Sequence, residues 1–167
     1  MAHPNEDLVR RGYKAFNTSD VETLRQLFAD TTIFHEPGRS PISGDYQGLD
    51  QVLGFFGALA ERSGGTFQAN LHDVVANDEH AIGLHSSDAE RDGRAVRSPT
   101  VLVFHVHDGR ITETWSHHHD QHDFDAFWGW NGISAPVGRL TAGQLTPCMA
   151  IDGMLERSLL TVVRIPA

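Results

Sequence analysis

The sequence predicts an α+β domain, with helices in its first part followed by a mostly antiparallel sheet. Apolar residues recur at helical spacing as far as residue 60, and from residue 66 they alternate with polar residues, as in strands. The alternating segments are separated by Asn77-Asp78, Asp92-Gly93 and Asp108-Gly109, which are typical of tight turns. Tight turns join antiparallel strands, so the sheet should be mostly antiparallel.

Three helices are expected before the sheet. Asn5 can cap the first, which should end near Asn17, and Ser19 or Asp20 can cap a shorter second helix. The third, at 49–60, is apolar round much of its circumference, which is typical of a helix buried against a large surface.

A short strand at 31–36 should lie between the second and third helices, followed by a loop at 39–48. The remaining strands, and a final turn or two of helix, are expected at 66–76, 81–87, 95–107, 110–120 and 123–130. With 167 residues the chain fits one domain, at 1–130, and a C-terminal extension at 131–167 whose pattern fits either a helix and a strand or a loose segment.

Composition narrows the range of partners. The formal charge is 13 − 22 = −9 and no basic run occurs, so nucleic acid is not an expected partner. Cys148 is the single cysteine, which excludes an internal disulfide and fits a reducing compartment. The chain begins with polar, acidic residues and has no run of ~18 apolar residues, so we expect a cytoplasmic protein without a membrane partner.

Six of the eleven histidines lie between residues 105 and 122, beside a carboxylate. They resemble a metal site, but side chains alternate across a strand. His117 and His119 therefore share one face, whereas His118 and Asp120 share the other. No helical zinc motif, phosphate loop or nucleotide-binding fingerprint is visible, so we expect neither a metal nor another cofactor. The alternative is a metal enzyme whose ion is held by His117 together with His105 or His119.

The turn at Asp108-Gly109 decides which residues face His118. A two-residue turn pairs His107 with Arg110, and a bulged turn pairs Val106 with Arg110. We predict the bulge. It places His118 on one face with Asp120 and with a larger set of residues, namely Thr100, Leu102, Phe104, Thr114 and Ser116.

The opposite, outer face would then carry apolar side chains, namely Val101, Val103, Ile111 and Trp115. This face is apolar enough to suggest a homodimer.

Several motifs occur in an order that resembles a known family. They are Asp20-Val21-Glu22, Phe34-His35-Glu36-Pro37-Gly38, the hairpin at 108–111, and Glu113-Thr114-Trp115 leading to Asp120. Over residues 5–130 the chain resembles the SnoaL-like and ketosteroid isomerase-like branch of the nuclear transport factor 2-like superfamily. The resemblance implies a curved sheet that three helices wrap into a cone (a cystatin-like α+β barrel), with a pocket inside and often a dimer on the outer sheet face.

The resemblance also implies roles for particular residues. Glu36 occupies the place of the carboxylate base of the isomerases, and Tyr13 could serve as their hydrogen-bonding tyrosine. Leu102 stands where those enzymes carry a protonated aspartate, which disfavours steroid isomerisation. In SnoaL-like cyclases the acid/base role resembles that of Asp120, with His118 beside it on the same face.

We therefore expect Asp120 to be the main acid/base group and His118 to tune it or relay its proton. Across the pocket, His35 or Glu36 could bind the substrate, but adjacent strand residues diverge, so only one should face inward. The alternative for Asp120 is a cap for the turn at Asp123, and the alternative for Glu36 is an ion pair with Arg39.

Further side chains should line the pocket and bind a hydrophobic ligand, namely Tyr13, Phe55, Phe56, Leu102, Phe104, Ser116 and Trp128. For the aromatic residues, simple core packing is the alternative. The function expected is a cofactor-independent general acid/base enzyme for a small hydrophobic carbonyl or polyketide-like substrate, of cyclase, isomerase or dehydratase type. The alternative is a non-catalytic module of the same fold that binds a hydrophobic ligand or dimerises.

Overall fold

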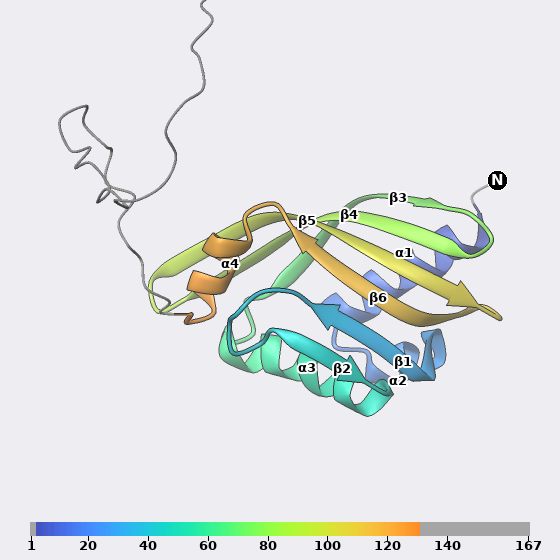
Figure 1. The fold of residues 1–167 in the computed structure, drawn as a ribbon, viewed down its shortest axis with the longest axis horizontal. Helices are drawn as coiled ribbons and strands as arrows, with labels where there is room; N and C mark the ends of the chain where they lie inside the picture. The colour runs from blue at the N-terminus through green and yellow to red at the C-terminus, as the bar shows by residue number, and fades with distance from the viewer. Residues whose placement is uncertain (1–2, 131–167) are drawn as a thin grey trace, which may run out of the picture. The chain divides into compact units, whose positions relative to one another are not determined.

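The computed structural model describes residues 3–130, and the expectations for 131–167 and Cys148 lie outside the described residues. Six strands form one open sheet in the order β2-β1-β6-β5-β4-β3 (Figure 1). β1 and β6 run parallel and the other neighbours run antiparallel. The elements are α1 (Pro4–Asn17), α2 (Val21–Leu27), β1 (Phe28–Glu36), β2 (Gly44–Gln47), α3 (Leu49–Arg62), β3 (Gln68–Ala76), β4 (His80–Arg91), β5 (Arg94–His107), β6 (Arg110–His118) and α4 (Gln121–Phe127).

The predicted α+β class and the three early helices are confirmed. The first helix cap is different from the predicted one. α1 begins at Pro4, which has no N–H to leave unpaired, and His3 caps it by accepting a bond from the Asn5 backbone N–H at 3.2 Å. The Asn5 side chain instead donates to the backbone oxygens of Asn77 and Asp78, at 2.8 and 3.1 Å. It therefore ties α1 to the turn between β3 and β4.

The sequence pattern did not predict β2. Its residues, Gly-Asp-Tyr-Gln, show no alternation of apolar and polar side chains, and they lie within the expected loop at 39–48. They pair antiparallel with β1, with Glu36 opposite Gly44. β2 is thus an edge strand that depends on its partner rather than on its own propensity.

The hairpin between β5 and β6 has a two-residue turn, so the predicted bulged turn is wrong. His107 pairs with Arg110, and Asp108 and Gly109 both have positive φ, of 48° and 70°. A bulge lies further along, at Thr112, where the register shifts by one residue. That bulge returns His118 to the predicted face of the sheet, shared with Thr100 and Ser116, although the residue opposite Thr100 is His118 rather than Ser116 as the predicted turn would require.

The same shift turns Ile111 to the helix-covered side of the sheet, where it is 1% exposed. The expectation that Ile111 lies on the outer face is therefore wrong. Val101, Val103 and Trp115 are only half-buried. The homodimer through this face stays a prediction.

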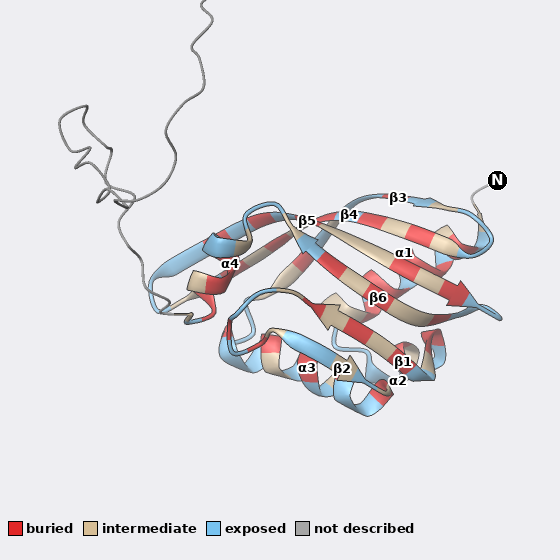
Figure 2. Cartoon of the chain, viewed as in Figure 1, coloured by how far each residue is buried: buried red, intermediate tan, exposed pale blue. Residues whose placement is uncertain are grey.

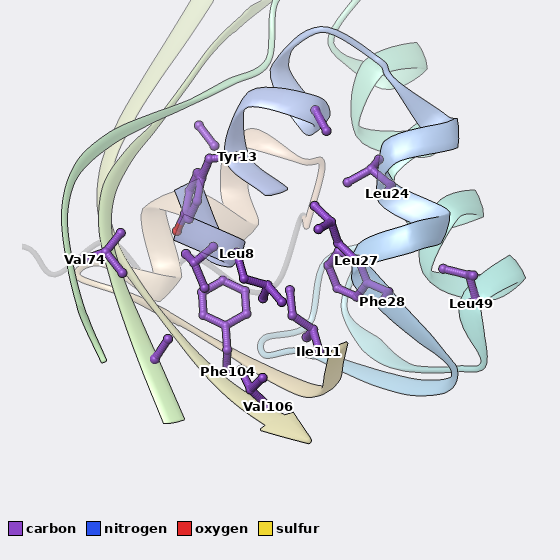
Figure 3. Packing of buried hydrophobic residues seen from close by; sticks show 14 residues of the cluster. Leu8, Tyr13, Leu24, Leu27, Phe28, Leu49, Val74, Phe104, Val106 and Ile111 are labelled. Atoms are coloured by element: carbon purple, nitrogen blue, oxygen red, sulfur yellow. The ribbon is translucent and has the colours of Figure 1, made fainter. Parts of the chain in front are cut away.

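Two hydrophobic clusters lie between the helices and the sheet, and buried positions alternate along the strands (Figure 2). In the first, Tyr13 of α1 and Leu27 of α2 pack towards Phe104 and Ile111 of the strands (Figure 3). The second lies around α3 and α4 and includes Phe55. Among the described residues, no helix is long and apolar enough to cross a membrane.

Candidate active site

A cavity of about 80 Å³ lies between the two hydrophobic clusters. Most of its wall is aromatic or aliphatic carbon, supplied largely by Phe16, Phe28, Phe34, Phe55, Phe56, Phe67, Leu102, Phe104 and Phe124. A smaller set of polar side chains reaches it, namely Tyr13, Glu36, His85, Ser87, Thr100, Ser116 and His118. In the described part of the chain no lysine or arginine lines it, so the site suits an uncharged ligand.

A buried carboxyl–imidazole pair lies in this wall. Glu36 ends β1 and His118 ends the neighbouring β6, which places Glu36 Oε1 2.8 Å from His118 Nε2. Their side chains are only 4% and 2% exposed. Phe124 of α4 stacks on the His118 ring at a centroid distance of 3.6 Å, and Ser116 Oγ lies 3.1 Å from Nε2. The imidazole is thus held on both its face and its edge.

Burial raises the pKa of the Glu36 carboxyl above its usual range. Hydrogen bonds and charge from His118 and a hydrogen bond from Ser116 act in the opposite direction, and the negative charge of Asp125 adds to the increase. Desolvation is the largest of these effects. A carboxyl group of this kind can exchange a proton closer to neutral pH than an exposed glutamate can.

A chain of hydrogen bonds continues from His118 along the sheet. His118 Nδ1 lies 3.0 Å from Thr100 Oγ1, which lies 3.2 Å from Ser87 Oγ. Ser87 Oγ is 3.0 Å from His85 Nε2, and His85 Nδ1 is 2.8 Å from the Tyr13 hydroxyl. Thr100 Oγ1 also lies 3.0 Å from the backbone oxygen of Ser98, so that oxygen is a further acceptor for its single hydroxyl proton.

The far end of this chain is neutral. Burial, with a smaller contribution from His118, lowers the pKa of His85 to about 4, and burial raises the pKa of Tyr13. Gly83 leaves room for the tyrosine, since a Cβ there would lie 2.6 Å from the Tyr13 oxygen. A neutral imidazole and a protonated phenol are therefore expected at neutral pH.

The loop after β1 holds α4 in place. The buried Asp125 carboxylate accepts from the Arg39 backbone N–H at 2.9 Å and from Gln121 Nε2 at 3.1 Å. Gln121 also donates to the backbone oxygen of Pro37 at 3.2 Å. Gly38, at φ 109°, lies directly against these side chains. This contact keeps Phe124 over His118.

Comparison with known proteins identifies the family. The sequence profile of the SnoaL-like domain matches residues 9–114. The chain belongs to the SnoaL-like family. An uncharacterized protein of Mycobacterium tuberculosis is 32% identical over 123 residues, which are 73% of this chain and 94% of that protein.

Solved structures agree with this assignment. Bal32a, from a soil-derived mobile gene cassette, is 39% identical with a TM-score of 0.74, and the match covers 76% of this chain and 98% of Bal32a. IdmH of Streptomyces antibioticus, a candidate polyketide cyclase, is 23% identical with a TM-score of 0.59, over 70% of this chain and 92% of IdmH. The likeness to IdmH shows the fold alone.

Within this SnoaL-like domain, Asp120 does not face the cavity, and the expectation that it does is wrong. β6 ends at His118, so strand alternation no longer applies two residues later. Asp120 is exposed and caps α4, with Oδ1 2.9 Å from the Asp123 backbone N–H. The alternative role, a cap for the turn at Asp123, is the one observed.

His35 also lies outside the cavity. Its Nδ1 is 2.7 Å from Asp45 and its Nε2 is 2.9 Å from Glu113, and its ring stacks on Trp115. Of the adjacent residues His35 and Glu36, only Glu36 faces inward, and its partner is His118 rather than Arg39.

Trp128 is buried but does not line the cavity, because it packs against Phe67, Phe124 and Phe127. The other expected lining residues do border it, namely Tyr13, Phe55, Phe56, Leu102, Phe104 and Ser116. Their part in ligand binding stays a prediction.

His85 and Ser87 are site residues that the sequence pattern did not identify. Both alternate with exposed or half-buried neighbours along β4, which is a signal of inward orientation. However, the pattern alone gives no reason to expect a hydrogen-bonded histidine there.

Proposed function

We propose that this SnoaL-like domain is a cofactor-independent general acid/base enzyme acting on a small, uncharged, hydrophobic carbonyl compound. Glu36 and His118 are the proton-transfer pair. The observation that carries the proposal is the position of this pair, which is almost fully buried and borders an aromatic cavity. General acid/base catalysis by such a pair is the chemistry expected of a cyclase, isomerase or dehydratase acting on a polyketide-like molecule.

The pair can act in both directions. As a base, the Glu36 carboxylate removes a proton from carbon next to a carbonyl group, and the electron pair of that C–H bond forms the enolate. As an acid, the protonated pair returns the proton to carbon or oxygen. His118 can hold the proton in place of Glu36, because the two groups are 2.8 Å apart.

The cavity limits what can bind without rearrangement. Its volume of about 80 Å³ is smaller than the ~150 Å³ of an engineered apolar cavity that holds one benzene molecule. A ring-sized ligand therefore requires lining side chains to move. The side chains expected to move are Phe16, Phe56 and Phe67, because all three are only half-buried. The Phe16 ring contacts the other two edge to face.

A non-catalytic ligand-binding module is the second candidate. The almost wholly apolar cavity wall favours it, since such a wall binds hydrophobic molecules whether or not chemistry follows.

Deuterium exchange distinguishes the two candidates. The protein is incubated in D2O with cyclohexanone, 2-indanone or 2-tetralone, and loss of the α-proton signals is followed by ¹H NMR. We expect the wild type to accelerate exchange and the Glu36→Gln variant to be slower by ~10²–10⁴-fold, the usual contribution of general acid/base catalysis. Phenylpyruvate, which carries a charge, should not be a substrate.

Glu113→Gln is the matched control. The Glu113 carboxylate also contacts a histidine, His35, at 2.9 Å, but does not line the cavity. This variant and Asp120→Asn, which keeps a capping side chain, should exchange the ketones at the wild-type rate. A ketone that binds to the wild type but exchanges no faster than in buffer would favour the binding module. Equal rates for Glu36→Gln and the wild type would remove Glu36 from the proposal.

A further inference from the structure

The hydrogen bonds between Glu36 and Tyr13 form one unbroken chain, of which the proposed proton transfer uses only the first link, between Glu36 and His118. Its intermediate members are His118, Thr100, Ser87 and His85, which lie on the neighbouring strands β6, β5 and β4. Each link joins groups that can both donate and accept, apart from the carboxylate. The direction in which each proton points is therefore set by the ends.

The direction is fixed when Glu36 is ionised and His118 is neutral. His118 must then donate from Nε2 to the carboxylate, which leaves Nδ1 as an acceptor for the Thr100 hydroxyl. Because Thr100 has only one proton, its oxygen must accept from Ser87, as two facing oxygens without a proton between them at 3.2 Å would repel.

The same constraint passes to the far end. Ser87, having donated to Thr100, accepts from His85 Nε2, so Nδ1 of the neutral His85 accepts from the Tyr13 hydroxyl. The only proton of Tyr13 is thus held by His85 and cannot be offered to a ligand.

One additional proton on the pair removes this constraint. If His118 carries it, both ring nitrogens are protonated and Nδ1 donates to Thr100. If Glu36 carries it, the carboxyl group can donate to His118 Nε2, and the one ring proton of His118 then lies on Nδ1. Thr100 is then free to donate to the Ser98 carbonyl, 3.0 Å away, or to Ser87. In the second case Ser87 donates to His85 Nε2, Nδ1 donates to the Tyr13 oxygen, and the Tyr13 proton can point into the cavity.

We propose that the Glu36–His118 pair controls Tyr13 through Thr100, Ser87 and His85, so that the Tyr13 hydroxyl becomes available to a ligand oxygen only after the pair has gained a proton. This inference rests on the proposed function. Tyr13 is then a catalytic residue that binds the substrate oxygen, and Thr100, Ser87 and His85 are positioning residues.

Control of Tyr13 by the Glu36–His118 pair suits a reaction in which a proton leaves one carbon of the substrate and returns to another. Removal of the C–H proton forms an O–H bond on Glu36 or an N–H bond on His118, and the released electron pair moves through the conjugated system to the carbonyl oxygen. The Tyr13 hydroxyl becomes free at that moment and donates to the new enolate oxygen. Return of the proton to a second carbon restores the carbonyl group and locks Tyr13 again.

The arrangement also narrows the substrate class. Glu36 and His85 lie on the first and last of four neighbouring strands, so their backbones are roughly 14 Å apart along the sheet at ~4.8 Å per strand, and less across its curved face. His85 in turn holds the Tyr13 hydroxyl. The fitting substrate is an uncharged conjugated carbonyl compound long enough to reach both ends.

Other charged groups also act on the two ends. Asp125 acts on Glu36, and Asp88 and His118 act on His85. Among the described residues, these charges shift the pKa values of Glu36 and His85, but it is the hydrogen-bonded chain through Ser87 that couples the tautomer of His85 to Thr100.

The tautomer of His85 can be measured without a substrate, by ¹⁵N NMR of its ring nitrogens between about pH 5 and pH 9. We expect the wild type to show only the Nε2–H tautomer at high pH, with the Nδ1–H tautomer appearing as the pair gains its proton. Thr100→Val removes the middle link, so its His85 tautomers should not change with pH.

Thr114→Val is the matched control, because it makes the same substitution at another buried threonine of the sheet whose hydroxyl has no hydrogen-bond partner among the described residues. It should behave as the wild type. Ser87→Ala breaks a second link and should give the same result as Thr100→Val. If one of these variants folds poorly, the other still provides the test. A single His85 tautomer at every pH in the wild type, or an unchanged switch in both broken variants, would overturn the inference. Ketone exchange by the wild type would leave the proposed function standing in either case.

Discussion

Glu36→Gln should unfold at a higher temperature than the wild type at neutral pH, although it has lost the proton-exchange activity. Burial raises the pKa of Glu36, so the folded protein holds this proton more tightly than the unfolded chain does. The free energy of unfolding therefore falls as the pH rises from the ordinary value of 4.5 through the raised pKa. Glutamine never ionises, so it avoids this penalty and can still hydrogen-bond to His118.

Melting temperatures measured by circular dichroism across this pH range test the prediction. The advantage of Glu36→Gln should be largest at neutral pH and should shrink as the pH falls toward 4.5, where the wild-type carboxyl becomes protonated in both states. Glu113→Gln, which removes a half-exposed carboxylate that contacts His35, should not raise the melting temperature at neutral pH. A Glu36→Gln variant that is less stable than the wild type at neutral pH would mean that the bond to His118 outweighs the cost of burying the charge.

Gly38→Ala should be the most damaging single-methyl change in the described domain. The added Cβ would lie 2.2 Å from Asp125 Oδ1 and 2.5 Å from Gln121 Nε2. In addition, the backbone φ of 109° is one that residues other than glycine rarely adopt. Strain and overpacking together should lower the free energy of unfolding by about 3 kcal/mol. Displacement of α4 should also move Phe124 away from His118 and slow ketone exchange.

Gly129→Ala is the control for the backbone strain alone. Gly129 has a similar φ of 100°, and a Cβ there would meet no atom of the described residues within 4 Å. Urea denaturation of both variants should therefore show a cost of only about 1 kcal/mol for Gly129→Ala. Equal losses in the two variants would show that the contact with Asp125 and Gln121 does not matter.

The periodicity of the sequence predicted most of the fold. It identified α3 and the alternating strands because each buries one face against its own neighbours. It could not predict β2, whose four residues carry no pattern and form a strand only because the edge of β1 offers hydrogen bonds. It also placed the bulge of the last hairpin at the turn rather than at Thr112, since both positions put Thr100 and His118 on the same face of the sheet.

The site was harder to predict than the fold. Alternation correctly placed Ser116 and His118 on the inner side, but it failed at Asp120, where the strand has already ended and the chain turns into α4. The choice between His35 and Glu36 depends on how β1 pairs with β6, a parallel contact between segments far apart in the sequence. The register between these two strands cannot be predicted from the local sequence of either one.

The proposed function requires Glu36 to hold an exchangeable proton inside the aromatic cavity. The most direct measurement is a ¹³C NMR titration of the Glu36 side-chain carboxyl in the wild-type protein, assigned by comparison with Glu36→Gln. We predict a midpoint above the ordinary value of 4.5, because desolvation dominates the hydrogen bonds from His118 and Ser116. A midpoint at or below 4.5 would contradict the account, because it would show a carboxylate that stays ionised and serves only to hold His118.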